Sequence, residues 1–417
     1  MKAFLEIVRL ELRRLLRSKA LAALTVASLA WMFAFPHLVK SDGTVDGAHE
    51  LYVHFSLGGV FVMCLVALAA SAAGSLSRER EQKRLQLTAV RPVRIFAVAL
   101  ARSAALTLAG AFVLALSAAV LAFNVDVSRP CDKVLSPVME SPRAEAEKMY
   151  DYYMASPETP DDVKKAKRSV VIRLLTQRAF DNYMSIPAGQ TASWNFDAPE
   201  EGEFAVRLRF TNDFETRQDV MGEFRIGDHV GAMTNKTQAV VRVPLAKADG
   251  GTKAGERNVL NFRNDGDAGL MLRPRRDINL LVKADSFGWN ILRAYLELVA
   301  ILSLTTSFGV FLGAGLGRSV AVFTMVSVIF VSVASSDILD LYPDQLEKDR
   351  ADSIGLVITR TVEQMTRPAV SLRPLAALAA DERVEPREVA SALAMDLIVF
   401  PLVLSLLSAF ALVRKQE

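Results

Sequence analysis

The chain has 417 residues, more than one ordinary domain requires, and 51% of them are hydrophobic while 23% are charged. The apolar residues must therefore be concentrated in segments. A net charge of +3 does not indicate a nucleic-acid partner. The two cysteines, Cys64 inside an apolar run and Cys131 outside one, exclude a disulfide framework and a cysteine-based metal site.

The first predicted element is an amphipathic helix within residues 1–19. Its apolar face consists of Phe4, Leu5, Val8, Leu12, Leu15 and Leu16, and its polar face of Lys2, Glu6, Arg9, Arg13 and Arg17. This two-sided pattern favours a helix that lies in a membrane interface. The alternative is a continuous extension of the first membrane span.

Five or six apolar runs approach the roughly 20 residues that a helix needs to cross a bilayer. They are Ala20–Val39, Leu51–Leu76, Ile95–Phe123, Trp289–Leu316, Val320–Ser335 and Ala390–Val413. The fifth is short and diluted by serines, so a re-entrant segment is its alternative. The first is too long for the apolar part of a typical signal peptide, which favours an uncleaved anchor.

The basic residues predict the orientation of the spans, because cytoplasmic loops carry an excess of Lys and Arg. With six spans, four basic sites fall on one side: the N-terminal segment, the loop between spans two and three, Arg318, and Arg414 with Lys415. That side is predicted to be the cytoplasm, so both termini are cytoplasmic. The loops 40–50, 124–288 and 336–389 are then external. With five spans the C-terminal basic pair would lie outside, against the rule.

The loop between the second and third spans, LSREREQKRLQLTAVRPV, is strongly charged. Ser77 is a suitable N-cap, and Glu79 lies in the first turn, where the helix dipole favours acids. Glu79 can also pair with Lys83, and Pro92 ends the helix. The loop is therefore predicted to form a short surface helix over residues 77–91. A solvated connector that obeys the charge rule is the alternative.

This stretch resembles the segment that follows the second span in type-2 ABC exporter permeases. In that family, an RERE-x-x-x-L-x-L-x-x-x-x-P-V segment forms the coupling helix that docks in a groove of the ATP-binding subunit. The matching residues are Ser77, Arg78, Glu79, Arg80, Glu81, Leu85, Leu87, Pro92 and Val93. The chain departs from the family at Lys83 and Arg84, where Gly-Thr is usual, and at Arg94, where Ser or Thr is common.

Two further regions carry the resemblance. The amphipathic N-terminal segment is similar to the family's elbow helix. The C-terminal stretch from Leu372 resembles the family's usual close: an external P-L-x-A-L stretch, a polar step, a final span and a basic end. The resemblance thus covers the spans and their cytoplasmic loops, and it implies a permease subunit.

The resemblance also implies partners and coupling residues. The residues expected to couple the permease to its ATPase are Glu79, Arg80, Glu81 and Arg84. No G-x-x-x-x-G-K-[ST] sequence is present to hold ATP phosphates, so ATP is expected to bind a partner chain, and no cofactor is predicted for this one. One six-span unit resembles half a translocator, so a second permease copy, identical or homologous, and two ATPases are implied.

Residues 124–288 are far longer than the family's usual connection and are predicted to form a separate domain. Residues 124–190 carry helical spacing, as in PRAEAEKMYDYYMAS. Residues 191–287 change to alternation, as in EFAVRLRF, AVVRVPL and DINLLVK, which is typical of a β-sandwich. Trp194 and Phe196 could stack on a sugar ring; the alternative is packing in or beside the core.

Other groups offer chemistry without a complete motif. The histidines near the outer ends of the first two spans are His37, His49 and His54. They could hold a metal or a proton, although a polar cap at the interface is the stronger interpretation. Glu297 and Asp396 lie within or near spans, where acids often mark a pathway. Pairing of Glu297 with Arg293 is the structural alternative.

The predicted fold class is an α-helical multi-span membrane protein with an inserted extracytoplasmic α+β domain that contains a β-sandwich. The predicted parts are 1–19 (elbow helix), 20–123 (spans one to three), 124–190 (external helices), 191–287 (β-sandwich), 288–336 (spans four and five), 337–389 (external helical loop) and 390–417 (last span and cytoplasmic tail). The expected function is that of an export-type ABC permease in the lipid bilayer of a bacterial inner membrane. The alternative is a non-transporting anchor that displays the β-sandwich for adhesion or complex assembly. No catalytic constellation is found, so an enzyme is not predicted.

Overall fold

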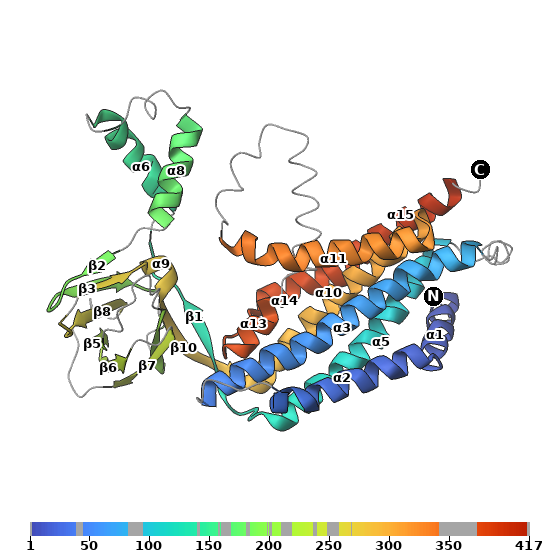
Figure 1. Cartoon of the computed structure of the whole chain (residues 1–417), viewed down its shortest axis with the longest axis horizontal. Helices are drawn as coiled ribbons and strands as arrows, with labels where there is room; N and C mark the ends of the chain where they lie inside the picture. The colour runs from blue at the N-terminus through green and yellow to red at the C-terminus, as the bar shows by residue number, and fades with distance from the viewer. Residues whose placement is uncertain are drawn as a thin grey trace. The chain divides into compact units, whose positions relative to one another are not determined.

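The computed structural model describes residues 2–38, 45–81, 95–139, 142–156, 159, 168–180, 184–197, 199, 202–209, 219–236, 240–247, 258–267, 269–341 and 373–414. The chain divides into two units (Figure 1). The helical unit consists of Met1–Cys131, Asp285–Pro343 and Arg350–Glu417, and the β unit of Asp132–Ala284 with Asp344–Asp349. A helical part and a separate β domain are therefore confirmed as the architecture.

Ten elements build the helical unit within the described residues. They are α1 (Lys2–Leu16), α2 (Lys19–Leu38), α3 (Val45–Glu81), α5 (Ile95–Asn124), α10 (Phe287–Gly315), α11 (Arg318–Leu341), α13 (Arg373–Ala379), α14 (Pro386–Ala392), the π-helix η1 (Leu393–Val399) and α15 (Phe400–Arg414). Across these ranges, five helical stretches are long and apolar enough to cross a membrane: Lys19–Leu38, Gly47–Arg78, Ile95–Asn124, Phe287–Gly315 and Pro386–Val413. They coincide with five of the predicted spans, two of which extend one residue beyond the helical stretch: Ala20–Val39 and Trp289–Leu316.

The remaining predicted span, Val320–Ser335, lies in α11. This helix is continuous from Arg318 to Leu341, but its apolar part, Arg318–Ile329, is shorter than the five stretches above. Its crossing of the bilayer stays a prediction.

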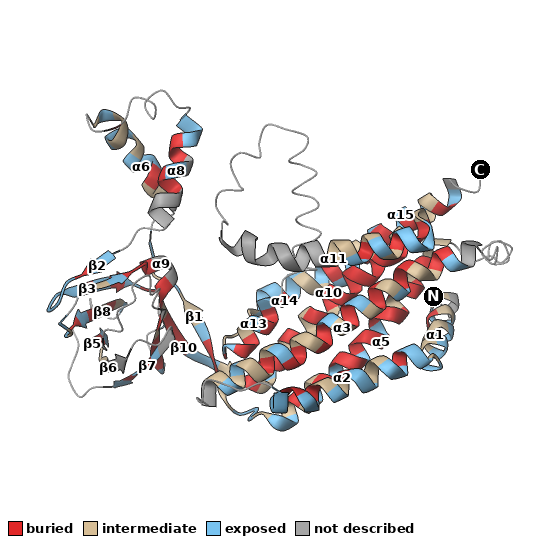
Figure 2. Ribbon diagram, in the orientation of Figure 1, coloured by how far each residue is buried: buried red, intermediate tan, exposed pale blue. Residues whose placement is uncertain are grey.

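Helix α10 is the central helix of the bundle and packs against α3, α5 and α15 (Figure 2). Small residues bring α10 close to α3. A Cβ atom at Gly309 would lie 2.9 Å from the Cβ of Ala72, and one at Gly313 would overlap the carbonyl oxygen of Ala73. Backbone contact of this kind gives packing energy where lipid and protein are equally apolar.

Helix α1 is separate from α2, because the helix stops at Leu16 and a turn follows. The backbone amide of Leu21 donates a hydrogen bond to Ser18 Oγ at 3.3 Å, so Ser18 caps the start of α2. Residues of one α1 face pack on Ala101 and Ala105 of α5, and they include Phe4, Ile7, Val8, Leu12 and Leu15. Leu5 and Leu16 of the predicted apolar face are exposed instead.

One prediction about the charged loop is wrong. Ser77 was expected to begin a new helix, but α3 continues without interruption to Glu81. Ser77 is buried, and its hydroxyl donates a hydrogen bond to the carbonyl of Ala73 at 3.2 Å. A serine that bonds back to the preceding turn satisfies its hydroxyl inside a helix, so it does not act as a cap.

The strands of the β unit are mostly antiparallel neighbours in one curled sheet. Their bounds are β1 (Pro130–Leu135), β2 (Met184–Ile186), β3 (Thr191–Asn195), β4 (Phe204–Arg209), β5 (Asp219–Ile226), β6 (His229–Lys236), β7 (Val240–Lys247), β8 (Val259–Asn264), β9 (Leu270–Leu272) and β10 (Ile278–Ser286), with the short helix α9 (Pro274–Asp277). The eight-stranded order is β1-β10-β4-β7-β6-β5-β8-β3, and β2 pairs with β9 separately.

This sheet differs from the predicted sandwich of two sheets. Strand β7 pairs along its length with β4 but reaches β6 only at its last residues, where Lys247 lies opposite His229. The sheet therefore turns a corner at β7 and closes over its own core. Gly231 lies at this corner, where a Cβ would meet the Pro244 carbonyl oxygen at 2.6 Å.

The residues predicted to face inward are buried where side chains are described, although Ala205 and Leu281, which lie between them, are buried too. The buried core contains Phe204, Val206, Leu208, Val243, Leu245, Ile278, Leu280 and Val282, packed against Phe224, Ile226, Leu260 and Phe262. Trp194 and Phe196 belong to the same core and are 5% and 2% exposed. Neither ring can offer a face to a sugar, so core packing is the correct interpretation.

The segment 124–190, predicted to be helical, is mixed. Helices α6 (Pro142–Ala155) and α8 (Arg168–Phe180) pack on each other through Ala146, Val171, Ile172 and Leu175. Strands β1 and β2 also lie in this segment and were not predicted.

Candidate functional site

The predicted coupling residues lie at the end of α3 and beyond it. Glu79, Arg80 and Glu81 occupy the last helical turn of α3, and their side chains lie outside the described part of the structure. Arg84 lies in the range 82–94, outside the described residues. The backbone thus continues as one helix from an apolar, membrane-length stretch into the charged stretch.

Helix α1, the start of α5 and the end of α15 gather at this same end of the bundle (Figure 1). A buried ion pair joins two of them: Arg102 Nε of α5 lies 3.2 Å from Glu11 Oε1 of α1. The Arg102 side chain is only 7% exposed and that of Glu11 is 20% exposed, so the pair is largely shielded from water. Breaking a buried pair leaves an uncompensated charge, and this contact therefore fixes α1 against the bundle.

Hydroxyl groups meet inside the bundle between α5 and α10. Thr107 and Thr306 share a hydrogen bond of 2.9 Å, with either oxygen as donor. Tyr295 on α10 donates to the carbonyl of Ala111 on α5 at 3.2 Å. These contacts link the two helices at positions far apart in sequence.

The two acids predicted to lie within or near spans are both on helices of this unit. Glu297 lies in α10 and Asp396 in η1, and α10 packs against η1. The suggested pairing of Glu297 with Arg293 is wrong. Arg293 donates a hydrogen bond to Asp285 Oδ2 at 2.8 Å instead, because Asp285 lies just before α10, at the level that the long arginine side chain reaches.

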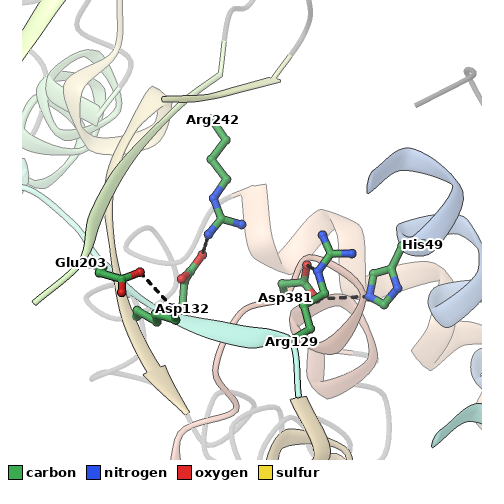
Figure 3. A network of polar contacts seen from close by, with 7 residues as sticks. His49, Arg129, Asp132, Glu203, Arg242 and Asp381 are labelled. Carbon is green, nitrogen blue, oxygen red and sulfur yellow. Dashed lines mark hydrogen bonds and ion pairs between the residues drawn. The ribbon is translucent and has the colours of Figure 1, made fainter. Parts of the chain in front are cut away.

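A polar network closes the opposite end of the helical unit (Figure 3). His49 Nε2 of α3 lies 3.2 Å from Asp381 Oδ1, and Arg129 Nε lies 2.9 Å from Asp381 Oδ2. Asp381 follows α13 with a positive φ of 54°. Aspartate tolerates this left-handed conformation better than most residues, and its carboxylate reaches both partners from there.

The same end is braced by Asn290 of α10. Its side-chain amide donates to the carbonyl of Glu382 at 2.7 Å and accepts from the amide of Val384 at 2.8 Å. Asn290 therefore holds the turn between α13 and α14 against the first helical turn of α10.

The three histidines do not form one site. His49 pairs with Asp381, His54 makes an edge contact with Phe55, and His37 is exposed. Among the residues that the structure describes, no three His, Cys, Asp or Glu side chains group as metal ligands.

In the β unit, the ion pair of Asp132 with Arg242 joins β1 to β7 (Figure 3).

Asp285 is held between two guanidinium groups, those of Arg293 and Arg383, the latter with its Nε 3.1 Å away. The hydrogen bond from Arg293 lowers the pKa of Asp285 below its ordinary value, and both arginines add an electrostatic contribution. A depressed pKa in the folded protein means that ionised Asp285 stabilises the fold.

We expect the Asp285→Asn variant to unfold at a lower temperature than the parent chain at neutral pH. The difference should persist above about pH 4, the ordinary range of aspartate, and vanish as the pH falls through the lower folded pKa. Unfolding temperatures of the full-length protein in detergent from pH 7 to pH 3 measure this. Glu50→Gln, at an exposed acid of the same unit, is the control. An equal deficit at pH 3 and pH 7 would contradict the assignment.

Sequence reasoning missed two of these features for different reasons. Arg102 is the one charged residue in the run Ile95–Phe123, and a single cation within a span is a signal that could have identified a buried pair. The contact of His49 with Asp381 joins residues 332 positions apart (381 − 49), and no local pattern indicates it.

No protein-family model, curated protein or solved structure matches the chain.

Proposed function

We propose that the chain is the membrane-spanning permease subunit of an export-type ABC transporter and that a separate ATP-binding subunit drives it. The observation that carries this proposal is the continuity of α3. A single helix leads from a membrane-length apolar stretch into the charged stretch Ser77–Glu81, which resembles the family's coupling segment. The five membrane-length helices support the same proposal.

A continuous helix is a suitable lever, because its hydrogen-bonded backbone moves as a unit. A push on Glu79 and Glu81 moves α3 along its length. The close contact of α3 with Gly309 and Gly313 passes this movement to α10. Helix α10 in turn packs on α5, η1 and α15, so the displacement reaches every helix that surrounds it.

The proposed arrangement in the membrane follows from the basic residues. Both termini and the end of α3 lie in the cytoplasm of a bacterium, and the β unit lies outside the inner membrane. Two permease copies and two ATPases form the transporter, and each Glu79–Arg84 segment contacts one ATPase. Neither ATP nor another cofactor binds this chain itself.

The test is isolation of the complex. The full-length chain, tagged and isolated from the membranes of its own host, should co-purify in equal amounts with an ATPase that carries a G-x-x-x-x-G-K-[ST] loop. An ATPase whose loop lysine is changed to alanine should still bind this chain, but it should not hydrolyse ATP. If the chain retains no ATPase, it would instead be the non-transporting anchor. The separate hydrophobic core of the β unit is the feature that favours this alternative.

A further inference from the structure

Helix α1 runs across the end of the bundle at which α2 and α5 begin (Figure 1), and one of its faces packs on Ala101 and Ala105 of α5. Helix α5 has 30 residues and is about 45 Å long, so it exceeds a hydrocarbon layer of about 30 Å by roughly 15 Å. The contact with α1 begins six residues after Ile95 (101 − 95), about 9 Å from the start of α5. With α5 centred in the layer, α1 lies at the boundary between headgroups and hydrocarbon.

The face of α1 that is turned to the bundle uses one of the two acids of this helix. Glu11 Oε1 lies 3.2 Å from Arg102 Nε, and Glu11 Oε2 lies 3.7 Å from a terminal nitrogen of Arg14. The Glu11 side chain is only 20% exposed. Its carboxylate therefore neutralises a buried arginine of the bundle and adds little negative charge to the outer surface of α1.

The outer surface of α1 is strongly basic. Among the side chains that the structure describes in residues 4–17, the exposed charged ones are Glu6, Arg9, Arg13, Arg14 and Arg17. Glu6 lies 3.9 Å from Arg9, and these side chains are 65% and 62% exposed. An exposed pair at this distance contributes little, so four arginines are set against one weakly paired carboxylate.

Three of these arginines form one row. Arg9, Arg13 and Arg17 follow one another at intervals of four residues, and the amide of Arg17 donates to the carbonyl of Arg13 at 3.1 Å, so the helical turn continues to Arg17. Residues four apart are neighbours on a helix surface, and like charges at this spacing repel each other. Phosphate groups along the row would remove this repulsion, and a guanidinium group binds phosphate through two parallel hydrogen bonds.

An apolar flank lies beside this row. Leu5 and Leu16 are 58% and 63% exposed. They are eleven residues apart, close to three helical turns, so they share one flank of α1. Arg9 follows Leu5 by four residues and is its neighbour on the helix surface. The leucine flank can therefore enter the hydrocarbon while the arginine row stays at the level of the headgroups, as in interfacial helices.

The combination of row, flank and depth favours a lipid over the other anions that arginines bind. A free phosphate ester would engage the row but would leave Leu5 and Leu16 in contact with water. A soluble protein would approach from the water side, whereas these leucines lie next to the packing face of α1, at the boundary of the hydrocarbon. An anionic phospholipid supplies both the phosphate and the acyl chain.

We propose that the outer surface of α1 binds anionic phospholipids, with phosphate groups along Arg9, Arg13 and Arg17 and acyl chains against Leu5 and Leu16. The inference goes beyond the proposed function, because a permease and a non-transporting anchor would present the same surface. Since the pair of Glu11 with Arg102 ties α1 to α5, bound lipid also stabilises the bundle.

Photolabelling of the purified full-length chain in a neutral detergent tests this surface. The probe is phosphatidylglycerol with a photoreactive diazirine in its headgroup, and mass spectrometry of the peptides locates the label. We expect label within residues 4–17. Unlabelled phosphatidylglycerol should compete about tenfold better than phosphatidylcholine or more, because only the former carries a net negative charge. Soluble glycerol phosphate should not compete.

A charge-matched pair of variants identifies the residues. The variant that combines Arg9→Gln, Arg13→Gln and Arg17→Gln should lose about tenfold or more of this labelling, since each basic residue near a charged membrane surface contributes about fivefold in affinity. The control loses the same charge at exposed positions away from α1, and it combines Arg225→Gln, Lys247→Gln and Arg387→Gln. It should be labelled as the parent is.

The competition experiment uses the unaltered chain and does not depend on the folding of any variant. Equal competition by phosphatidylcholine, or competition by glycerol phosphate, would overturn the proposal. Equal labelling of the parent and the triple arginine variant would do so as well. Absence of label from residues 4–17 would assign the arginine row to a protein partner or to water, and would likewise overturn it.

Discussion

Replacement of Glu79 and Glu81 together by lysine is expected to abolish the coupling of ATP hydrolysis to transport while the chain still inserts in the membrane. Both acids lie on the last turn of α3, which continues from the membrane-length stretch. Juxtaposed like charges cost several kcal/mol at an interface, so a groove complementary to these acids would reject the lysines. ATP hydrolysis by the complex in lipid vesicles, with and without the permease, should lose about tenfold or more of its stimulation.

The control for this experiment is charge reversal elsewhere at the same end of the bundle. Glu6 of α1 is exposed, with a side-chain exposure of 65%, and its ion pair with Arg9 is long at 3.9 Å. Glu6→Lys should therefore leave hydrolysis, transport and membrane insertion close to those of the parent. Normal transport by the double lysine variant would show that Glu79 and Glu81 do not receive the force.

Substitution of Gly313 by valine is expected to destabilise the helical unit. A side chain at Gly313 would overlap the backbone oxygen of Ala73, and backbone cannot move aside as a side chain can. Overpacking of this kind costs about 1–3 kcal/mol and forces the helices apart. The unfolding temperature of the full-length chain in detergent measures the effect.

Gly315 provides the matched control, because it lies on the same helix and a Cβ there would meet open space. Gly315→Val carries the same β-branched side chain, so any general effect of valine on α10 is shared. A lower unfolding temperature is expected for Gly313→Val alone, together with weaker stimulation of the ATPase. Equal unfolding temperatures for the two variants would mean that α3 and α10 do not need this close approach.

The sequence alone predicts the membrane-length helices well, because a continuous apolar run has one stable outcome in lipid. The run Ile95–Phe123 differs from α5 by one residue, since polar residues flank it on both sides. The end of α3 is harder to predict. Ser77 looks like a cap in sequence, and only its burial against the preceding turn shows that the helix continues.

The β unit shows the same division between local and non-local information. Alternation predicts the inward faces of β4, β7 and β10, because the period of a strand is fixed by its backbone. The corner at β7 depends on which strands pair, and strand β1 joins β10 from more than 140 residues away in sequence. Such pairings carry no local signal, so one curled sheet and a sandwich share the same pattern.

Side-chain partners are the least predictable part of the candidate site. Arg293 has an acid four residues away in Glu297, yet it reaches Asp285, whose carboxylate also receives Arg383. Helical spacing permits the first pair, but the second lies at the end of the bundle, where charge is less costly than in the interior. The consequence is that Glu297 Oε2 has no hydrogen-bond partner among the residues that the structure describes.

The most direct measurement of the central claim is photo-crosslinking from the charged segment. A photoreactive amino acid in place of Arg84, in the full-length chain expressed in its own host, should yield a covalent product with an ATPase that carries a G-x-x-x-x-G-K-[ST] loop. The same amino acid in place of Met221, an exposed position of β5, should yield none. A product from position 221, or no product from position 84 in a complex that co-purifies, would contradict the claim that this end of α3 receives the force of ATP hydrolysis.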